Sequence, residues 1–154
     1  MRQSALSLPQ EVVNVSYITP DPIVPHLLLS HFHNPVAGAV VLFSGDVRDN
    51  NKNKEVLYLE YEAFPEMANK MIDDILLTAK EQWNLVTAFC QHRTGKLLPS
   101  ECSVVVITVS KHRKEAYEAN RFIIDNVKKD VPIWKKEFFK DAPPKWTAND
   151  LTAE

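Results

Sequence analysis

The chain has 154 residues, of which 45% are hydrophobic and 25% charged, and its formal net charge is −2. This length suits one domain that buries roughly two thirds of its unfolded surface, and the composition excludes a disordered or fibrous protein. An overall acidic chain is also a poor general binder of nucleic acid, so we expect no nucleic-acid partner.

Membrane insertion and metal binding find no support in the sequence. The longest apolar run, residues 104–107, is far shorter than the roughly 20 residues that cross a bilayer, and the N-terminus lacks the pattern of a signal peptide. We therefore expect a soluble, cytoplasmic protein. Cys90 and Cys102 lie in β-prone stretches without the spacing of zinc ligands. We expect both to be buried thiols, and we expect no metal and no cofactor.

The first part of the chain predicts mainly strands. Residues 1–10 are expected to be a flexible tail, residues 12–19 a strand, and Leu27–Leu29 part of a short helix after a proline-marked turn. The β-branched run from Gly38 to Gly45 and the alternating segment 55–64 predict two adjacent strands joined by a polar loop.

The second part adds two helices and further strands. An apolar row with a spacing of four follows Pro65 and predicts an amphipathic helix of about five turns: Met67, Met71, Ile75, Ala79 and Trp83. Segments 85–93 and 102–110 predict strands around a turn, and the second is apolar enough to be central in a sheet. A second amphipathic helix is predicted from about His112 to Lys129, halted before Pro132. The elements predict a single α+β domain over residues 1–154 with an antiparallel or mixed sheet, and residues 147–154 as a second tail.

Positive charge is concentrated in one segment. Residues 111–140 hold nine Lys and Arg against five Asp and Glu, a net of +4, whereas the rest holds nine against fifteen, a net of −6. The chain contains three glycines, which are too few and too scattered for a phosphate-binding P-loop or a dinucleotide-binding turn. The pattern favours a site for a small anion or for an acidic partner surface.

The predicted second helix begins with Lys111, His112, Arg113 and Lys114, where the helix dipole is already positive. Such a breach of local preference suggests an anion site, because cations and free backbone N–H groups together hold a phosphate. A solvated basic face, with His112 capping or packing, explains the same residues equally well. Lys128 and Lys129 end this helix, where the dipole alone accounts for them.

Lys135 and Lys136 follow Trp134 in an extended segment, where neither helix propensity nor a dipole explains them. Strand alternation points them to opposite faces, so one of them can enter a pocket and serve as a proton carrier or nucleophile. Arg48, at a strand end, suits bidentate binding of a phosphate or carboxylate, although an ordinary surface arginine is the simpler interpretation. We interpret His92 and Arg93 as structural, and no catalytic cysteine is evident.

Four parts of the sequence resemble the large, catalytic subunit of molybdopterin synthase, the MoaE family. They are "GAVVLFSGDVRDNN", "LEYEAFPEMA", "VSKHRKEAYEANRFIIDNVKKDVPIWKKE" and Trp146. The resemblance implies an α/β hammerhead-like fold and a homodimer at the core of a heterotetramer, with a small ubiquitin-like sulfur-carrier subunit docked at each end. It also implies sulfurtransferase activity in molybdenum cofactor biosynthesis. Sulfur would pass from the carrier's C-terminal thiocarboxylate to cyclic pyranopterin monophosphate (precursor Z), forming the dithiolene of molybdopterin.

The resemblance also implies roles for individual residues. Lys135 matches the principal catalytic lysine and Lys128 a second lysine of the same pocket. His112 and Arg113 match a pair that enters the pocket of the other subunit and binds the substrate phosphate. The remaining substrate-binding positions implied are Asp46, Val47, Arg48, Lys136 and Glu137. The sequence departs from the family near the C-terminus, where "APPK" precedes Trp146 and the tail lacks an arginine found in some members.

Two other classes of protein remain as alternatives. A non-catalytic adaptor could bind a ubiquitin-like partner through the sheet and the basic segment. A ferredoxin-like RNA-binding module would need stacking aromatic residues on one sheet face, but Tyr58 and Tyr61 fall on opposite faces by parity. The negative net charge also argues against the RNA-binding module.

Overall fold

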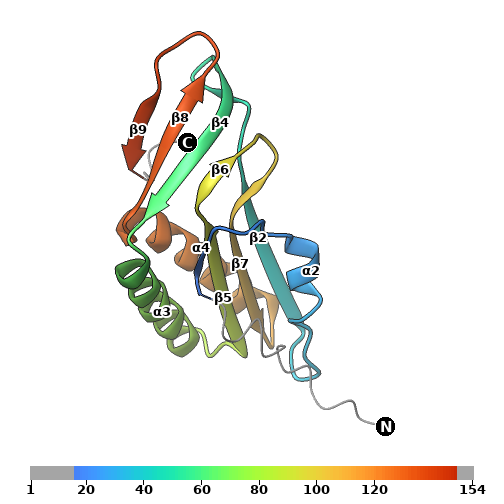
Figure 1. The fold of residues 1–154 in the computed structure, drawn as a ribbon. Helices are drawn as coiled ribbons and strands as arrows, with labels where there is room; N and C mark the ends of the chain where they lie inside the picture. The colour runs from blue at the N-terminus through green and yellow to red at the C-terminus, as the bar shows by residue number, and fades with distance from the viewer. Residues whose placement is uncertain (1–15, 149–154) are drawn as a thin grey trace.

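The computed structural model describes residues 16–148, and their strands form two sheets (Figure 1). The first sheet has the order β1-β5-β7-β2, made of β1 (Ile18–Thr19), β5 (Thr87–Arg93), β7 (Cys102–Ser110) and β2 (Ala39–Asp46). The second has the order β3-β4-β8-β9 with β6 beside β4, made of β3 (Asn50–Asn51), β4 (Lys54–Ala63), β6 (Gly95–Leu97), β8 (Ile133–Phe139) and β9 (Lys145–Ala148). β1 pairs in parallel with β5 and the other pairings are antiparallel, which confirms the α+β class with a mixed sheet.

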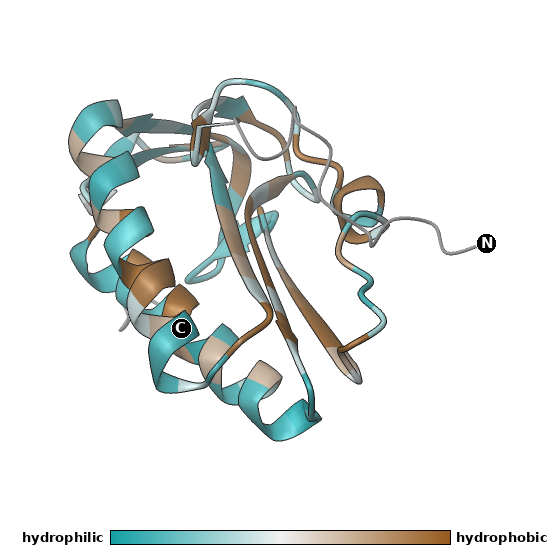
Figure 2. Ribbon diagram, turned by 90° about the horizontal axis from the view of Figure 1, so that it is seen from below, coloured by the Kyte–Doolittle hydropathy of each residue, from teal (hydrophilic) through white to brown (hydrophobic). Residues whose placement is uncertain are grey.

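Helices cover both faces of the first sheet. In Figure 2, α3 (Pro65–Gln82) and α4 (Arg113–Asp130) lie on one face and the short α2 (Pro25–Leu29) on the other. All nine residues of β7 are buried. Val104 and Val106 belong to the cluster on the side of the two long helices, whereas Val105 and Ile107 belong to the cluster on the α2 side. This alternation is the period of two that a strand buried on both faces requires, and it confirms β7 as a central strand.

The helix α3 has the predicted length, but the predicted apolar row coincides only in part with the side chains that it buries. Pro65 stands in its first turn, where the missing N–H has no cost, and the helix ends at Gln82. Met67, expected in the buried row, is 58% exposed. The buried residues are Ala68, Ile72, Leu76 and Ala79, of which Ala79 was in the predicted row. Met71, Ile75 and Trp83 of that row are partly buried against the same core. An apolar stripe more than about 100° wide contains both rows, and the sequence periodicity alone did not identify its centre.

The helix α4 was predicted correctly in both its extent and its buried face. Ala116, Ala119, Ile123 and Val127 are buried, and the helix ends at Asp130, two residues before Pro132. Asn120, also buried, donates two hydrogen bonds of 3.1 Å from Nδ2, to the carbonyl oxygens of Val41 and Val106. These bonds tie the middle of α4 to two strands of the first sheet. No helix within residues 16–148 is long and apolar enough to cross a membrane.

The prediction that the two early strands are adjacent is wrong. β2 pairs with β7 in the first sheet, whereas β4 pairs with β8 and β6 in the second. β7 is apolar on both faces and lies in the interior of the first sheet, between β5 and β2. β4 has one polar face and extends into the second sheet, which rises away from the first (Figure 1). The loop after β2 therefore carries the chain from one sheet to the other, and this crossing creates a space between the sheets.

The alternation in β4 is interrupted. Val56, Leu59 and Tyr61 are buried, so the buried side changes parity between Val56 and Leu59. The register with β8 shifts between Val56 and Tyr58, which marks a β-bulge there. A bulge inserts one unpaired residue and re-aims the side chains that follow it. In this strand it lets Val56 share the buried side with Leu59 and Tyr61.

The short strands β3 and β6 were not predicted, because two and three residues carry too little pattern. Of the expected first strand, only Ile18–Thr19 is a strand in the described part, and residues 12–15 lie outside it. The expected tail 1–10 and residues 149–154 also lie outside the described residues. Residues 147 and 148 were expected in a tail but belong to β9, where pairing with Lys135 and Trp134 of β8 orders them.

Candidate active site

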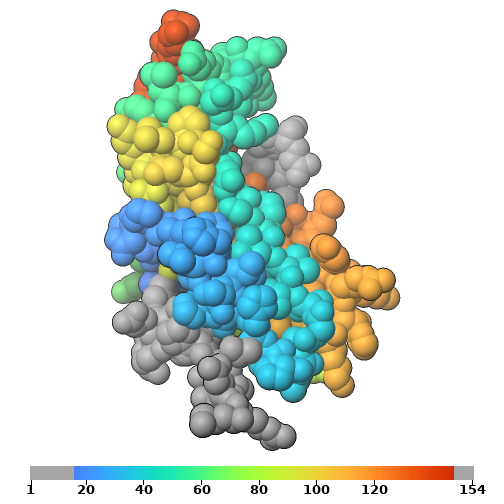
Figure 3. All heavy atoms as spheres, turned by 90° about the vertical axis from the view of Figure 1, so that its right-hand side faces the viewer, coloured from blue at the N-terminus to red at the C-terminus, as the bar shows by residue number. Residues whose placement is uncertain are grey.

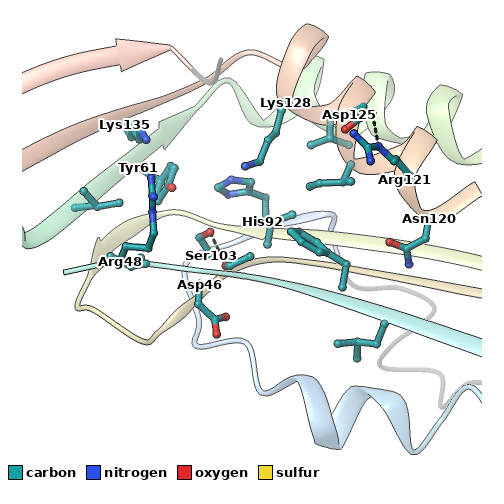
Figure 4. A pocket seen from close by; sticks show the side chains of 18 of the residues that line it. Asp46, Arg48, Tyr61, His92, Ser103, Asn120, Arg121, Asp125, Lys128 and Lys135 are labelled. Carbon is teal, nitrogen blue, oxygen red and sulfur yellow. Dashed lines mark hydrogen bonds and ion pairs between the residues drawn. The ribbon is translucent and has the colours of Figure 1, made fainter. Parts of the chain in front are cut away.

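A cavity of about 950 Å³ lies between the two sheets and α4, which lines it from Tyr117 to Lys128 (Figure 4). Its walls come from β2, β3, β4, β5, β7, β8, α4 and the loop after β2. Apolar side chains such as Phe43, Leu59 and Ile124 line it together with several charged ones. This volume is at the upper end of the range for small-molecule sites. The charged residues of the lining are Asp46, Arg48, Arg121, Asp125, Lys128, Lys135 and Glu137.

Strand β8 places Lys135 in the cavity wall. Its Nζ lies 3.5 Å from Oε1 of Glu137, and the two side chains are 21% and 4% exposed. The other carboxylate oxygen of Glu137 accepts a 2.7 Å hydrogen bond from Nδ2 of Asn51. A carboxylate buried to this extent needs such partners to stay charged. The amine of Lys135 is therefore held by a fixed anion at the edge of the cavity.

Lys128 reaches the cavity from the last turn of α4. A cation is favoured there by the negative end of the helix dipole, as the sequence indicated. Figure 4 shows its side chain descending from the helix toward the ring of His92. Lys135 approaches from β8 on another wall, so two lysines from different elements are directed into one space.

Two residues of the cavity floor, His92 and Tyr61, were not recognised from the sequence. His92 is 3% exposed and Tyr61 is 8% exposed, and their rings make an edge contact at 4.9 Å. Burial lowers the pKa of His92 to about 4; the positive charge of Lys128 adds to this effect, and the hydrogen bond to the Arg93 carbonyl opposes it. Burial also raises the pKa of Tyr61, with a further rise from the charge of Glu137. Both rings are therefore neutral at physiological pH.

The end of β2 brings three predicted residues to the cavity lining: Asp46, Val47 and Arg48. Val47 is buried, and its backbone N–H and C=O bond to Glu101 and Ser100, so its part is to anchor the strand end. Arg48 is exposed and directed toward the cavity, whereas the carboxylate of Asp46 points away from the two lysines (Figure 4). Oδ1 of Asp46 accepts a 2.6 Å hydrogen bond from the hydroxyl of Ser44.

Three other predicted residues do not line this cavity: His112, Arg113 and Lys136. His112 and Arg113 are exposed at the start of α4. At 1.5 Å per residue, Arg113 is about 22 Å from Lys128 along the helix. Nζ of Lys136 lies 5.1 Å from the ring centre of Phe138 and 5.5 Å from that of Trp146, so it follows the other face of β8. The predicted opposite facing of Lys135 and Lys136 is confirmed.

Neither cysteine is a nucleophile in this structure. Cys90 and Cys102 are both free and buried, as predicted. Burial raises the pKa of the Cys90 thiol to about 12, and burial also raises that of Cys102. The thiolate, which is the reactive form, is therefore scarce at neutral pH. In the part of the chain that the structure describes, no group of three or more His, Cys, Asp and Glu is placed to hold a metal ion.

Comparisons with known proteins give a consistent result. The family model described as MoaE protein matches residues 18–130. The molybdopterin synthase catalytic subunit of Halalkalibacterium halodurans is 38% identical over 134 residues, which is 87% of this chain and 85% of that protein. The crystal structure of molybdopterin synthase from Staphylococcus aureus is similar with a TM-score of 0.79 and 39% identity, covering 84% of this chain and 94% of that one.

A more distant structure shares the fold alone. It is the complex of subunits 1 and 2 of the molybdopterin-converting factor from Helicobacter pylori, which is similar with a TM-score of 0.70 at 21% identity. The match covers 88% of this chain and 90% of that one. The same arrangement of sheets and helices is therefore kept at low sequence identity.

Proposed function

Because the chain belongs to the MoaE family, we propose that it is the catalytic subunit of a molybdopterin synthase, a sulfurtransferase of molybdenum cofactor biosynthesis. The family model and the relatives cover most of the chain, so the likeness extends well beyond a single motif. We also propose that it works in the cytoplasm, in keeping with two free, buried cysteines.

The proposed reaction moves sulfur from a small ubiquitin-like carrier subunit to precursor Z. The carrier's C-terminal thiocarboxylate supplies the sulfur, and two transfers form the dithiolene of molybdopterin. The assembly is a homodimer of this chain with a carrier subunit docked at each end. The Helicobacter pylori structure is itself a complex of two subunits, which supports a two-component assembly.

The observation that carries the proposal is a cation-lined cavity in a chain whose thiols are unreactive. Arg48, Lys128 and Lys135 line the space, and they suit a substrate that carries a phosphate. The buried, protonated cysteines leave the chain without a sulfur nucleophile of its own. A sulfur that arrives on a partner's flexible tail resolves this, because the chain then only has to bind, orient and move protons.

Lys135 is proposed as the principal catalytic residue, with Lys128 as the second. The contact with Glu137 keeps the Lys135 amine in one position, and a positioned amine can pass a proton to or from a reacting group. Lys128 faces the same space from α4 and adds a second positive charge where an anion would develop. Arg48 and Glu137 are proposed to help bind substrate, together with the strand end at Asp46 and Val47.

His112 and Arg113 are proposed to act in the cavity of a second copy of the chain. Their distance of about 22 Å along α4 from Lys128 excludes a shared contact with one small substrate in the same copy. A dimer in which each α4 begins near the partner's cavity would supply the missing phosphate contacts. Mixed dimers of Lys135→Ala and Arg113→Ala subunits test this, because one intact site should form in trans. Mixtures that never regain activity would remove the support for this assignment.

The decisive experiment measures conversion of precursor Z to molybdopterin by the purified chain with a thiocarboxylated carrier subunit. Lys135→Ala and Lys128→Ala should each abolish or greatly reduce product. Lys129→Ala is the matched control, because Lys129 neighbours Lys128 but is exposed and does not line the cavity. Of the two lysines on β8, Lys136 faces away from the cavity, so Lys136→Ala should reduce product less than Lys135→Ala does. A wild-type chain that binds the carrier tightly but never turns over would instead indicate the non-catalytic adaptor.

A further inference from the structure

A buried histidine beside Lys128 has no part in the function described so far. We propose that His92 is a positioning residue for Lys128, whose amine it holds through the lone pair of Nε2. The inference rests on the proposed catalytic role of Lys128, and it concerns how that lysine is aimed.

The tautomer of His92 follows from one contact. Its Nδ1 lies 2.8 Å from the carbonyl oxygen of Arg93. A carbonyl oxygen can only accept a hydrogen bond, so Nδ1 must be the nitrogen that carries the proton. A neutral imidazole has a single N–H, so Nε2 keeps a lone pair that can accept a hydrogen bond from a nearby donor. The pKa of about 4 keeps the ring neutral throughout the physiological range.

The surroundings fix the direction in which this lone pair points. The backbone N–H of His92 donates a 2.7 Å hydrogen bond to the carbonyl oxygen of Tyr17, and the ring meets the Tyr61 ring edge-on, at 68° between planes. With 3% of the residue exposed, bulk water has little access to Nε2. Figure 4 shows the amine of Lys128 directed at the imidazole ring, and the charge of Lys128 is close enough to influence His92.

A neutral acceptor suits this task better than a carboxylate would. The lysine side chain is a flexible four-carbon stem that samples many rotamers unless its end is held. A carboxylate would hold it but would also offset part of its charge toward an anion in the cavity. The lone pair of His92 takes up one N–H of the ammonium group and leaves the positive charge available to an anion in the cavity.

The first test needs no substrate. The chain is labelled with ¹⁵N-histidine, and the ring nitrogens are observed by NMR in the wild type and in Lys128→Met. The signal of His92 among the five histidines is identified by its absence from His92→Gln. We expect an Nδ1–H tautomer whose Nε2 resonance moves toward that of a free acceptor in Lys128→Met. An Nε2–H tautomer, or an Nε2 resonance unaffected by Lys128→Met, would overturn the inference.

The second test separates positioning from a structural role. Asn at position 92 can still donate to the Arg93 carbonyl but reaches no further, whereas the longer Gln can place an oxygen near the position of Nε2. We expect kcat to fall roughly 10- to 100-fold in His92→Asn, as for a lost hydrogen bond to a charged group. His92→Gln should exceed His92→Asn by about tenfold, with KM changed little in either. His33→Gln, on an exposed loop residue, is the control.

The two tests distinguish the possible failures. If His92 served only to anchor the backbone, Asn would match the wild type and Gln would be the poorer variant, which is the reverse of the expected order. A wild type without turnover would defeat the proposed function, while the NMR comparison would still decide whether His92 holds Lys128. Thermal unfolding of each variant shows whether a loss of activity reflects a loss of fold, and the NMR comparison of the wild type with Lys128→Met does not depend on that result.

Discussion

The burial of a neutral histidine should make the stability of this protein depend on pH. The folded-state pKa of His92 is lowered to about 4 from its ordinary value of 6.5. Below pH 6.5 the unfolded chain therefore binds a proton that the folded chain does not accept until about pH 4. Stability from this group is fully present above pH 6.5 and is lost as the pH falls toward 4.

The size of the effect follows from the same two values. Each unit of pKa corresponds to about 1.4 kcal/mol, so this group should reduce the free energy of unfolding by about 2 kcal/mol between pH 7.5 and pH 5. Urea unfolding at these two pH values measures it in the wild type and in His92→Gln, which cannot titrate. We expect the drop in the wild type to exceed that in His92→Gln by about 2 kcal/mol.

A matched control separates His92 from the other histidines. His33 is exposed, and His33→Gln should follow the wild-type pH dependence closely. Carboxylates contribute to acid unfolding in all three proteins and cancel in the comparison. If the wild type and His92→Gln lost the same free energy on acidification, then His92 would not be held neutral by its environment, and the reasoning from burial would be refuted.

Three further outcomes follow from contacts in the structure. Lys135→Ala should destabilise the fold by about 1–3 kcal/mol, because it removes the cation beside the buried Glu137, and adding Glu137→Gln should restore stability in a denaturant titration without restoring activity. Gly45→Ala should cost about 1–3 kcal/mol in the same assay, since a Cβ there would lie 2.7 Å from Cγ1 of Val104; Gly95→Ser meets no neighbour within 4 Å and gauges strain from a positive φ alone. Native protein should react with a thiol reagent at neither cysteine at pH 7.5, and both should react in denaturant; fast native labelling would contradict the burial of Cys90 and Cys102.

The elements that carry a strong local pattern could be predicted from the sequence. The two long helices follow from apolar spacing and from Pro65 and Pro132, and the central strand β7 follows from its unbroken apolar run. The opposite facing of Lys135 and Lys136 needed only the alternation of a strand. In each case the information lies within one element, so nothing about the rest of the fold had to be known.

The sheet partners and two cavity residues could not be predicted in this way. Whether β2 pairs with β4 or with β7 depends on which strand completes a sheet, which is a property of the whole fold. Alternation placed Tyr61 on the same side of β4 as Leu59, but that this side faces a cavity follows only from how the two sheets pack. His92 stands on a strand that is buried on both faces, so burial did not distinguish it. The one available signal was its position two residues after Cys90, on the face that packs toward the long helices.

The geometry of α4 explains why one helix can carry basic residues at both ends. Its last turn places Lys128 in the cavity, where the negative end of the dipole favours a cation. Its first turn carries exposed cations against the dipole, and no contact within the described part of this chain compensates His112 or Arg113 for that position. Because Arg113 and Lys128 are about 22 Å apart along the helix, one small substrate cannot touch both. An anion supplied from outside the chain's own cavity, such as a substrate phosphate held by a second copy, would turn this unfavourable placement into a favourable one.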